Sequence, residues 1–363
     1  MTKQRKTIGV VGYGFVGEAV AKGLAPVADV IVYDKAKGWM EIRDGVVPMV
    51  CTGYGKIELD GSGRTADKPD GPGWEPIEHE DIGFVSLKER EDEPYTRLVQ
   101  HCSIIFVCVP TPMKPTGECS TAIVDEVVMG LNRAFVRHID GAERDEDIRD
   151  RPVVVIKSTV PPGTTARLQG ECGWLDLVFN PEFLTEANPN QDFAEMDRVV
   201  LGGEGRGLKE VLSLYRAFNG QRKRTDALMN WMTTDPHNNF HRLCCSPTEA
   251  EMIKYLTNCF LATKVSLANE FAQVCDKVGA DWETVWGIAS ADKRLGTSHW
   301  AVPNGDPPMH GFSGSCFPKD LNAMKVFMVD HGVMPLVLMA AWQTNLIVRP
   351  ERDWEQLKGR AVE

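Results

Sequence analysis

A cysteine in the last third of the chain is surrounded by the residue types of a covalent active site. Cys316 follows the Gly/Ser-rich run 311–315, and Lys319 and Asp320 come shortly after it. The apolar spacing beyond Asp320 predicts a helix that begins beside the cysteine. A helix N-terminus and a nearby lysine both favour the thiolate, the nucleophilic form of cysteine. Two interpretations stay open at this point: a nucleophile, or a buried thiol before a helix that Asp320 caps.

The N-terminal segment predicts a dinucleotide-binding turn. A β-branched run at 7–11 leads into GYGFVG, and a second apolar run at 29–33 ends at Asp34. The glycines allow a tight turn, close approach of a pyrophosphate and close packing of the following helix. The acidic residue would bind the adenosine ribose, so NAD is favoured over NADP. The expected cofactor-binding residues are Gly12, Tyr13, Gly14, Phe15, Val16, Gly17, Asp34 and Lys35.

Three further strands are expected at 102–109, 153–156 and 175–179, each followed by polar residues. In a doubly wound sheet the carboxyl ends of the strands line the ligand crevice. Thr111 and Thr159 are therefore candidate contacts, with a helix cap as the alternative for Thr159. Glu182 and Glu186 stand four apart beyond the last strand and would share one face of a helix. The alternative is that both are glutamates on the protein surface.

A long helix is predicted to begin near residue 246. Ser246 and Glu249 form a capping box around Pro247, and no breaker follows before Gly279. Lys254 and Asn258 stand at i and i+4, so they share one face of this helix. The alternative for Lys254 is a surface lysine whose stem lies along the helix.

Composition limits the classes of function. The chain has 363 residues and a net charge of −11, which argues for about two to three domains and against nucleic acid as a partner. Ten cysteines without a CxxC pair indicate free thiols, so neither a zinc site nor a disulfide scaffold is expected. We find no signal-peptide pattern and no membrane-length apolar run, and we expect a cytoplasmic protein that binds no membrane. The stretches 60–76 and 89–93 are predicted to be an exposed loop and a solvated face.

Five motifs occur in order along the chain: GYGFVG, CVPTP, KSTVPPGTT, NPEFLTEA and GFSGSCFPKD. Together with the segment 249–270, they resemble the nucleotide-sugar 6-dehydrogenases, the UDP-glucose/GDP-mannose dehydrogenase family, over residues 7 to about 345. The resemblance implies an α/β fold, with an N-terminal Rossmann-like doubly wound parallel sheet followed by an α-helical central domain. It also implies oxidation of a nucleotide-sugar, UDP-glucose to UDP-glucuronate as first expectation, for polysaccharide biosynthesis. Two NAD molecules would be reduced in turn. Cys316 would form a thiohemiacetal and then a thioester, and the long helix would join two subunits.

The resemblance assigns roles residue by residue. As catalytic residues it implies Cys316, Lys254, Asn258, Glu182, Asp320 and Thr159. It adds Val109, Pro110, Thr111, Thr159, Glu186 and Lys319 on the cofactor side. For the substrate it implies Phe183, Leu184, Lys254, Asn258, Arg294, Phe312 and Gly314. The first general base stays open among Glu182, Lys254 and Asp320.

The expected domains are an NAD-binding domain at 1–204, a helical domain at 205–345 and a short polar tail at 346–363, with the family's third domain absent. Ser313 stands where the family has glycine, so it would be strained if that position requires a positive φ. Two other functions remain open. One is a two-electron dehydrogenase of the 3-hydroxyacid type, which needs no nucleophilic cysteine. The other is a regulatory protein that binds the cofactor without catalysis.

Overall fold

The chain forms two compact units in the computed structural model. The first comprises Met1–Val109, Ala122–Ser158 and Pro162–Glu251, and the second comprises Pro110–Thr121, Thr159–Pro161 and Met252–Glu363. The structure describes residues 5–43, 46–52, 55–57, 76–79, 82–85, 93–139, 151–196, 198–221, 244–305 and 307–363.

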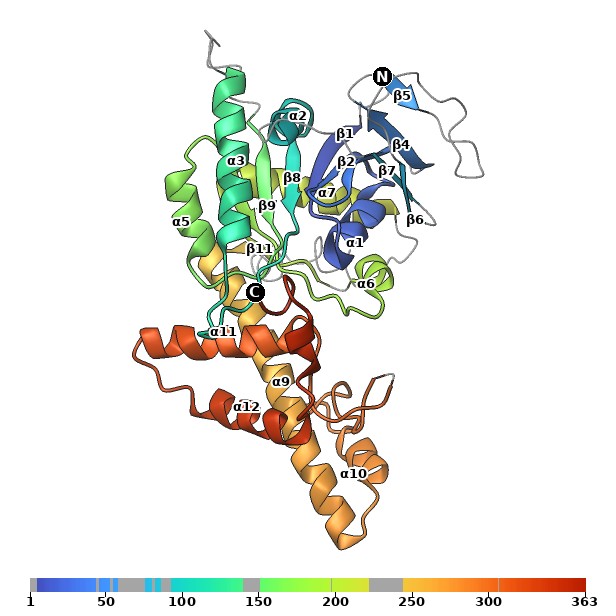
Figure 1. Ribbon diagram of the computed structural model, residues 1–363, viewed down its shortest axis with the longest axis vertical. Coiled ribbons are helices and arrows are strands. Elements are labelled where there is room, and N and C mark those ends of the chain that lie inside the picture. The colour runs from blue at the N-terminus through green and yellow to red at the C-terminus, as the bar shows by residue number, and fades with distance from the viewer. Residues whose placement is uncertain are drawn as a thin grey trace. The chain divides into compact units, whose positions relative to one another are not determined.

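A parallel sheet forms the centre of the first unit (Figure 1). Its strands pair side by side in the order β10-β9-β8-β1-β2. The bounds are Lys6–Val11 for β1, Ala28–Asp34 for β2, Ile104–Val107 for β8, Val153–Ile156 for β9 and Asp176–Phe179 for β10. The middle strands β8 and β9 are fully buried, as expected of a parallel sheet covered on both faces. The predicted Rossmann-like sheet is therefore confirmed.

Antiparallel strands extend this sheet at both edges. On one side β3 pairs antiparallel with β2 through the short connection 35–37, where a helical crossover would otherwise place a parallel strand. On the other side β11 pairs antiparallel with β10. The edge strands are β3 (Gly38–Arg43), β4 (Val46–Thr52), β5 (Gly55–Ile57), β6 (Pro76–His79), β7 (Ile82–Val85), β11 (Leu201–Gly202) and β12 (Cys244–Cys245).

Helices cover both faces of the sheet. Side chains of α1, α6 and α7 form one core with the strand residues that point to their face, including Val10, Val155 and Val178. Because side chains alternate along a strand, residues such as Val154 point to the opposite face, where α2 and α3 pack on each other and on β1 and β8. The helices of this unit are α1 (Phe15–Leu24), α2 (Glu93–His101), α3 (Ala122–Ile139), α5 (Thr164–Glu171), α6 (Pro189–Glu195) and α7 (Gly205–Gln221).

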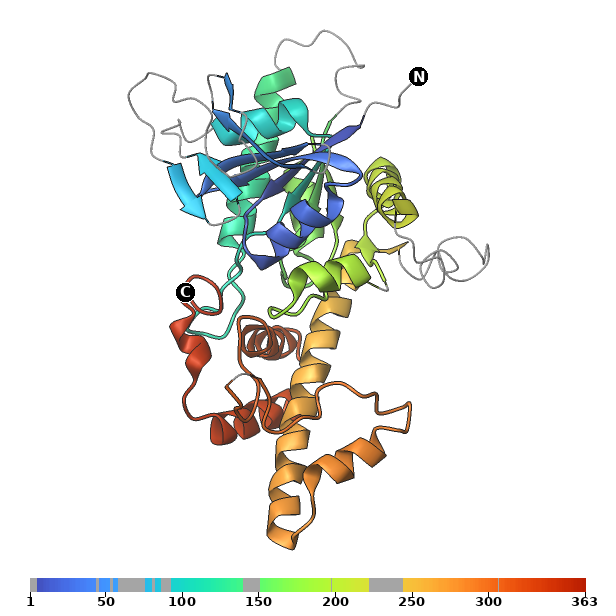
Figure 2. The ribbon, with the colours of Figure 1, turned by 90° about the vertical axis from the view of Figure 1, so that its right-hand side faces the viewer.

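The second unit is built around the long helix α9 (Pro247–Val278), which begins in the first unit. The predicted capping box is confirmed: the Ser246 Oγ accepts from the Glu249 amide at 3.2 Å, and the Glu249 carboxylate accepts from the Ser246 amide at 2.7 Å. Gly279, with φ +74°, follows the last helical residue. The other elements are α10 (Trp282–Ala289), α11 (Phe317–Asp330), α12 (Leu336–Val348) and the 3₁₀ turn η1 (Asp353–Gln356), and α11 and α12 lie beside α9 in Figures 1 and 2.

The division of the chain differs from the predicted one. The boundary was expected after residue 204, but α7 packs on β9 and β10 and belongs to the first unit. The expected polar tail is also folded. Trp354 and Ala361 are buried, and the Met113 amide donates to the Ala361 carbonyl at 2.9 Å. The first three residues of the predicted tail end α12, and beyond Val348 the apolar residues are few and scattered in a polar stretch, so no periodic pattern marks them.

The loop expected at 60–76 and the acidic run at 89–93 lie outside the described residues, except for the last residue of each. Among the helices that are described, none has both the length and the apolar character needed to cross a membrane.

Candidate functional site

The glycine motif of the first unit forms the turn between β1 and α1. Gly12 has φ +88°, and a Cβ there would lie 2.6 Å from the Cys108 carbonyl oxygen. A Cβ on Gly17 would lie 1.9 Å from the Gly12 carbonyl oxygen, so helix and turn touch directly. Gly14 is the N-cap of α1, is exposed, and has open space where a Cβ would stand. This geometry fits the pyrophosphate of a dinucleotide above the free amides of the helix.

Asp34 ends β2 beside this turn. Its carboxylate accepts from the Tyr13 amide at 2.7 Å, the Ala36 amide at 2.9 Å and the Lys37 amide at 3.1 Å. A carboxylate offers about four acceptor positions, so one remains for a ribose hydroxyl. The Lys37 ammonium donates to the Tyr13 carbonyl at 2.9 Å and ties the two turns together. The first unit therefore fits the adenosine half of NAD.

The other predicted cofactor residues differ in exposure. Lys35 is largely exposed and pairs with Glu126 at 3.6 Å. The Val109 carbonyl accepts from the Ser158 hydroxyl at 2.7 Å, whereas Glu186 is exposed. Phe15 and Val16 are the first two residues of α1. Of the remaining residues in this group, Pro110, Thr111, Thr159 and Lys319 belong to the second unit.

Glu182 and Glu186 do not share a helical face. No helix forms between the end of β10 at Phe179 and the start of α6 at Pro189, and Glu182 is buried while Glu186 is exposed. The Glu182 carboxylate accepts from the Leu184 amide at 2.7 Å, a local turn that competes with helix formation. The predicted substrate residues nearby are partly buried: Leu184 packs on the core, and the Arg198 guanidinium lies 4.3 Å from the centre of the Phe183 ring.

A buried polar network anchors the Glu182 turn, and the sequence reading missed it. Lys157 donates to the Asn180 side-chain oxygen at 3.0 Å, and the Tyr215 hydroxyl donates to the same oxygen at 2.6 Å. The Asn180 side-chain Nδ2 donates to the Val200 carbonyl at 2.8 Å. Lys157 and Asn180 are the first residues after β9 and β10, so polar residues directly at two neighbouring strand ends were the available signal.

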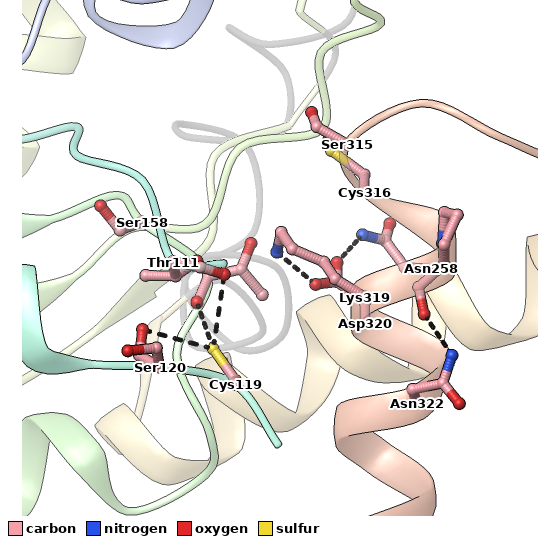
Figure 3. A network of polar contacts seen from close by, with 12 residues as sticks. Thr111, Cys119, Ser120, Ser158, Asn258, Ser315, Cys316, Lys319, Asp320 and Asn322 are labelled. Carbon is pink, nitrogen blue, oxygen red and sulfur yellow. Dashed lines mark hydrogen bonds and ion pairs between the residues drawn. The ribbon is translucent and has the colours of Figure 1, made fainter. Parts of the chain in front are cut away.

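The second unit brings together three of the predicted polar side chains on two helices. Asn258 on α9 donates to the Asp320 carboxylate on α11 at 2.5 Å, and Lys319 pairs with the other oxygen at 2.5 Å. Lys254, one turn before Asn258, is buried as well. Figure 3 shows Asn258, Lys319 and Asp320 joined in this way. Asp320 is therefore a buried carboxylate between two donors, and it does not cap α11.

The charges of this cluster shift one another. Burial is the largest single influence on Lys319 and lowers its pKa, but the Asp320 carboxylate, Cys119 and Cys316 together outweigh burial, and the net shift of the pKa is upward. Lys319 thus stays a cation although it is buried. Its charge lies within electrostatic reach of both thiols.

Cys316 is the N-cap of α11, and it is partly exposed. Its sulfur lies 3.8 Å from the Ser315 hydroxyl. In Figure 3 it stands at the start of the helix, one turn before Lys319 and Asp320. A helix N-terminus and a neighbouring ammonium are the two features that favour a thiolate, so the predicted environment of Cys316 is present in the structure.

A second thiol lies near the same lysine. Cys119 donates to the carbonyl oxygens of Thr159 at 3.6 Å and Thr111 at 3.8 Å. Burial raises the pKa of the Cys119 thiol, and the Lys319 charge offsets only part of that rise. Cys119 therefore stays protonated, and it connects the two predicted threonines through their backbone.

Ser313, Phe312 and Arg294 have surroundings in the structure that the sequence did not indicate. Ser313 does not have a positive φ, whereas its neighbours Gly311 and Gly314 do, at +68° and +77°, so the strain considered for Ser313 is absent. Phe312 is buried against Phe317 and Trp342 in the core of the second unit. Arg294 is exposed and binds Asp292 two residues before it.

A Rossmann-like domain with a dinucleotide-type glycine turn, joined in sequence to a helical domain built on one long helix, defines the class of NAD-binding dehydrogenase folds. The NAD binding domain of the UDP-glucose/GDP-mannose dehydrogenase family matches residues 86–219, and the central domain of the same family matches residues 248–346. The chain belongs to the UDP-glucose/GDP-mannose dehydrogenase family.

Individual relatives agree with this assignment. The UDP-glucose 6-dehydrogenase of Rickettsia bellii is 32% identical over 274 residues, which are 74% of this chain and 53% of the relative. The chain spans about half the length of the curated relatives it matches. A solved UDP-glucose dehydrogenase from Pyrobaculum islandicum has 26% identity and a TM-score of 0.63 over 95% of this chain and 69% of that one. The 3-hydroxyisobutyrate dehydrogenase of Mycobacterium tuberculosis, at 13% identity and a TM-score of 0.54 over 98% of this chain and 100% of that one, shares the fold alone.

Proposed function

We propose that this protein oxidises a nucleotide-sugar in two successive steps with NAD as acceptor, with UDP-glucose as the first candidate substrate and UDP-glucuronate as its product. The observation that carries the proposal is the placement of Cys316 at the N-terminus of α11, one turn from the Lys319–Asp320–Asn258 cluster. Family membership and the NAD-type turn support it.

The reaction is a four-electron oxidation of a primary alcohol to a carboxylate. NAD, when bound, accepts one hydride in each of the two oxidations. The alcohol loses a hydride and a proton and becomes an aldehyde. The Cys316 thiolate adds to the aldehyde carbon, and the thiohemiacetal loses the second hydride to give a thioester. Water then breaks the carbon–sulfur bond, which releases the carboxylic acid and returns the thiol.

The buried cations and amides of the second unit would stabilise the charges of this sequence. An oxyanion develops at the reacting carbon when the thiolate adds and again when water attacks the thioester. Lys254 and Asn258 on one face of α9, with Lys319, supply donors for it. The Asp320 carboxylate already accepts from Asn258 and Lys319, so it holds both donors in place, and it can exchange a proton with the Lys319 ammonium. Glu182 and Thr159 are the other candidates for moving protons.

Counting NADH per sugar separates the possible functions. The purified protein is mixed with NAD and a limited amount of UDP-glucose, and with a panel of other UDP- and GDP-sugars. Two NADH per sugar supports the proposed four-electron oxidation. One NADH per molecule, with 3-hydroxyacids as the better substrates, would indicate the two-electron alternative. No NADH with any substrate, together with measurable NAD binding, would indicate a regulatory cofactor-binding protein.

The covalent role of Cys316 is tested by its replacement. Cys316→Ser keeps the size of the side chain but removes the thiolate, so acid formation is expected to stop. Cys172→Ser is the matched control, because Cys172 is a buried thiol at the end of α5 in the first unit. Normal acid formation by Cys316→Ser would remove the covalent mechanism.

We further propose that two copies of the chain associate through α9. Large apolar side chains recur on its exposed side at spacings of three, four or seven residues, with exposed fractions from 40% to 71%. They are Met252, Leu256, Phe260, Leu267, Phe271, Val274 and Val278, named the α9 stripe below. An exposed apolar stripe of this length on one helix supports this association surface. The free state of the nine described cysteines is consistent with the cytoplasmic setting that we propose.

A further inference from the structure

The short segment 310–313 lies immediately before the Gly314-Ser315-Cys316 run, and buried side chains hold its backbone. These side chains come from α9 and from the end of α12, which are far from the segment in sequence. A Gly/Ser-rich run is costly to order, because its backbone has many accessible conformations when free. The contacts that fix its entry therefore decide where Cys316 stands.

Asn345 on α12 pairs with the backbone of Phe312 through both ends of its amide. Its Oδ1 accepts from the Phe312 amide at 2.7 Å, and its Nδ2 donates to the Phe312 carbonyl at 3.0 Å. Asn345 has no exposed surface, and Phe312 is 3% exposed. This is the pairing that one strand gives another in a sheet, supplied here by a single side chain. Loss of either bond would leave a buried polar group without its partner.

Asn269 on α9 holds the preceding residues. Its Oδ1 accepts from the Gly311 amide at 3.1 Å and lies 3.2 Å from the His310 Nδ1, while its Nδ2 donates to the Val265 carbonyl at 2.8 Å. Gly311 has φ +68°, and a Cβ there would lie 2.4 Å from the Asn345 Oδ1. Glycine is therefore required at 311 for two reasons: the backbone angle is positive, and a Cβ would clash with the Asn345 side chain that binds the next residue.

Arg349, at the end of α12, completes the set. Its guanidinium donates to the His310 carbonyl at 2.9 Å and binds the Asp353 carboxylate at 2.8 Å. Asp353 in turn accepts a hydrogen bond from the Ser313 side chain. Each of the four residues 310–313 is thus contacted by a polar group from α9, α12 or η1.

We infer that Asn345 and Asn269 are positioning residues for Cys316: they fix the segment 310–312 so that the thiol stands at the N-terminus of α11 within electrostatic reach of Lys319. The inference rests on the proposed function, in which Cys316 is the nucleophile. The two asparagines act through the backbone and do not touch the sulfur. Their effect is on the reactivity of the thiol and on catalytic turnover, and not on NAD affinity.

The test is the rate at which iodoacetamide alkylates Cys316, read by mass spectrometry on the peptide that contains it. Asn345→Asp keeps the shape and the acceptor but replaces the donor to Phe312 by an oxygen. We expect the rate of alkylation at pH 7 to fall by about tenfold. The thiolate is the form that reacts, so the rate falls by the same factor as the thiolate fraction of Cys316. Where turnover is measurable, kcat should fall by a similar factor while KM for NAD stays within about twofold, the pattern of a lost transition-state interaction.

Ser266→Ala is the matched control. The Ser266 hydroxyl on α9 donates to the Ala341 carbonyl on α12 at 2.8 Å, so this variant loses a buried bond between the same two helices without touching 310–313. Its alkylation rate should match that of the wild type. Unchanged alkylation of Cys316 in Asn345→Asp would show that Asn345 does not position the thiol. Faster alkylation would show that the substitution only loosens the structure and exposes the thiol. Either result would overturn the inference.

A measurement on the wild-type protein covers the case in which Asn345→Asp does not fold. Hydrogen exchange of the peptide spanning 310–312 should be as slow as that of α11, because the Gly311 and Phe312 amides are buried and bonded. Exchange within seconds would overturn the inference. Alkylation and exchange need no substrate, so a protein without dehydrogenase activity would refute the proposed function and still leave this inference tested.

Discussion

The side-chain amide of Asn258 on α9 and the carboxylate of Asp320 on α11 meet at 2.5 Å, and both residues are buried. Lys319 binds the other carboxylate oxygen. One acidic group thus neutralises a buried ammonium and fixes the amide of a facing helix. The pair joins the helix that carries Lys254 to the helix whose N-cap is Cys316.

Removing this carboxylate should destabilise the second unit. Asp320→Asn leaves Lys319 buried without its counter-ion, and breaking a buried pair from one side costs about 3–5 kcal/mol. The pKa of Lys319 should fall, because Asp320 is the main group that raises it. The measurement is the free energy of unfolding from urea titration followed by tryptophan fluorescence.

A second substitution and a surface control sharpen this test. Adding Lys319→Met to Asp320→Asn removes the orphaned charge, so part of the lost stability should return. Asp292→Asn breaks an exposed pair with Arg294, and its unfolding curve should match the wild type. Equal curves for Asp292→Asn and Asp320→Asn would contradict the importance of the buried pair.

Only the features of this cluster that depend on local spacing could be predicted from the sequence. The positions of Lys254 and Asn258 on one face of α9 follow from the helical repeat, and the capping box fixes where the helix begins. The joining of Asn258 to Asp320 spans 62 residues and depends on how α11 packs on α9. No local pattern encodes that packing.

The same reason explains what the sequence reading missed. Asn269 and Asn345 act on backbone groups 42 and 33 residues away, and each looks in sequence like an ordinary polar position of a helix. The helical face predicted for Glu182 and Glu186 is wrong because Glu182 folds back on the Leu184 amide. The antiparallel hairpin of β2 and β3 was not predicted either, since residues 36–98 carry no clear periodicity.

Asp34 should set both the affinity for NAD and the discrimination against NADP. A hydrogen bond to a charged group contributes about 1.5–3 kcal/mol, and about 1.4 kcal/mol corresponds to tenfold in Kd. Asp34→Asn should therefore raise the Kd of NAD by about tenfold or more, while the Kd of NADP stays equal or falls because the repelling charge is gone. Fluorescence titration with both cofactors measures the two constants.

Glu126→Gln serves as the control for this prediction. It removes a surface carboxylate that pairs with Lys35, next to Asp34, and leaves the turn itself intact. The Kd of NAD should not change in this variant. If Asp34→Asn lost affinity for both cofactors in the same proportion, the carboxylate would be acting only through the fold of the turn.

His299 should make stability depend on pH. Burial lowers the pKa of this histidine, and the nearby Lys264 charge lowers it further. The unfolded chain takes up the proton first as the pH falls below about 6.5, the ordinary histidine pKa. The free energy of unfolding should therefore fall between about pH 6.5 and the lower pKa of the folded state, and this loss should be absent above pH 7.

His299→Asn isolates this contribution. Residue 299 has φ +66°, a conformation that asparagine tolerates, so the backbone should be retained. The difference in unfolding free energy between wild type and variant should be constant above pH 7 and should move in favour of the variant as the pH falls toward 5. A difference that does not vary with pH would show that the ring of His299 titrates alike in both states.

The α9 stripe should control the oligomeric state. Leu256 and Phe271 are 68% and 54% exposed and lie in opposite halves of the stripe. A charge at either position would be buried without a partner in a dimer, so Leu256→Glu and Phe271→Glu should each shift the protein toward the monomer in sedimentation velocity. Gln273→Glu adds the same charge to the exposed surface of α9 outside the stripe and should leave the dimer intact. Monomeric wild type, or dissociation by Gln273→Glu as readily as by Leu256→Glu, would show that the stripe is not the contact between two copies.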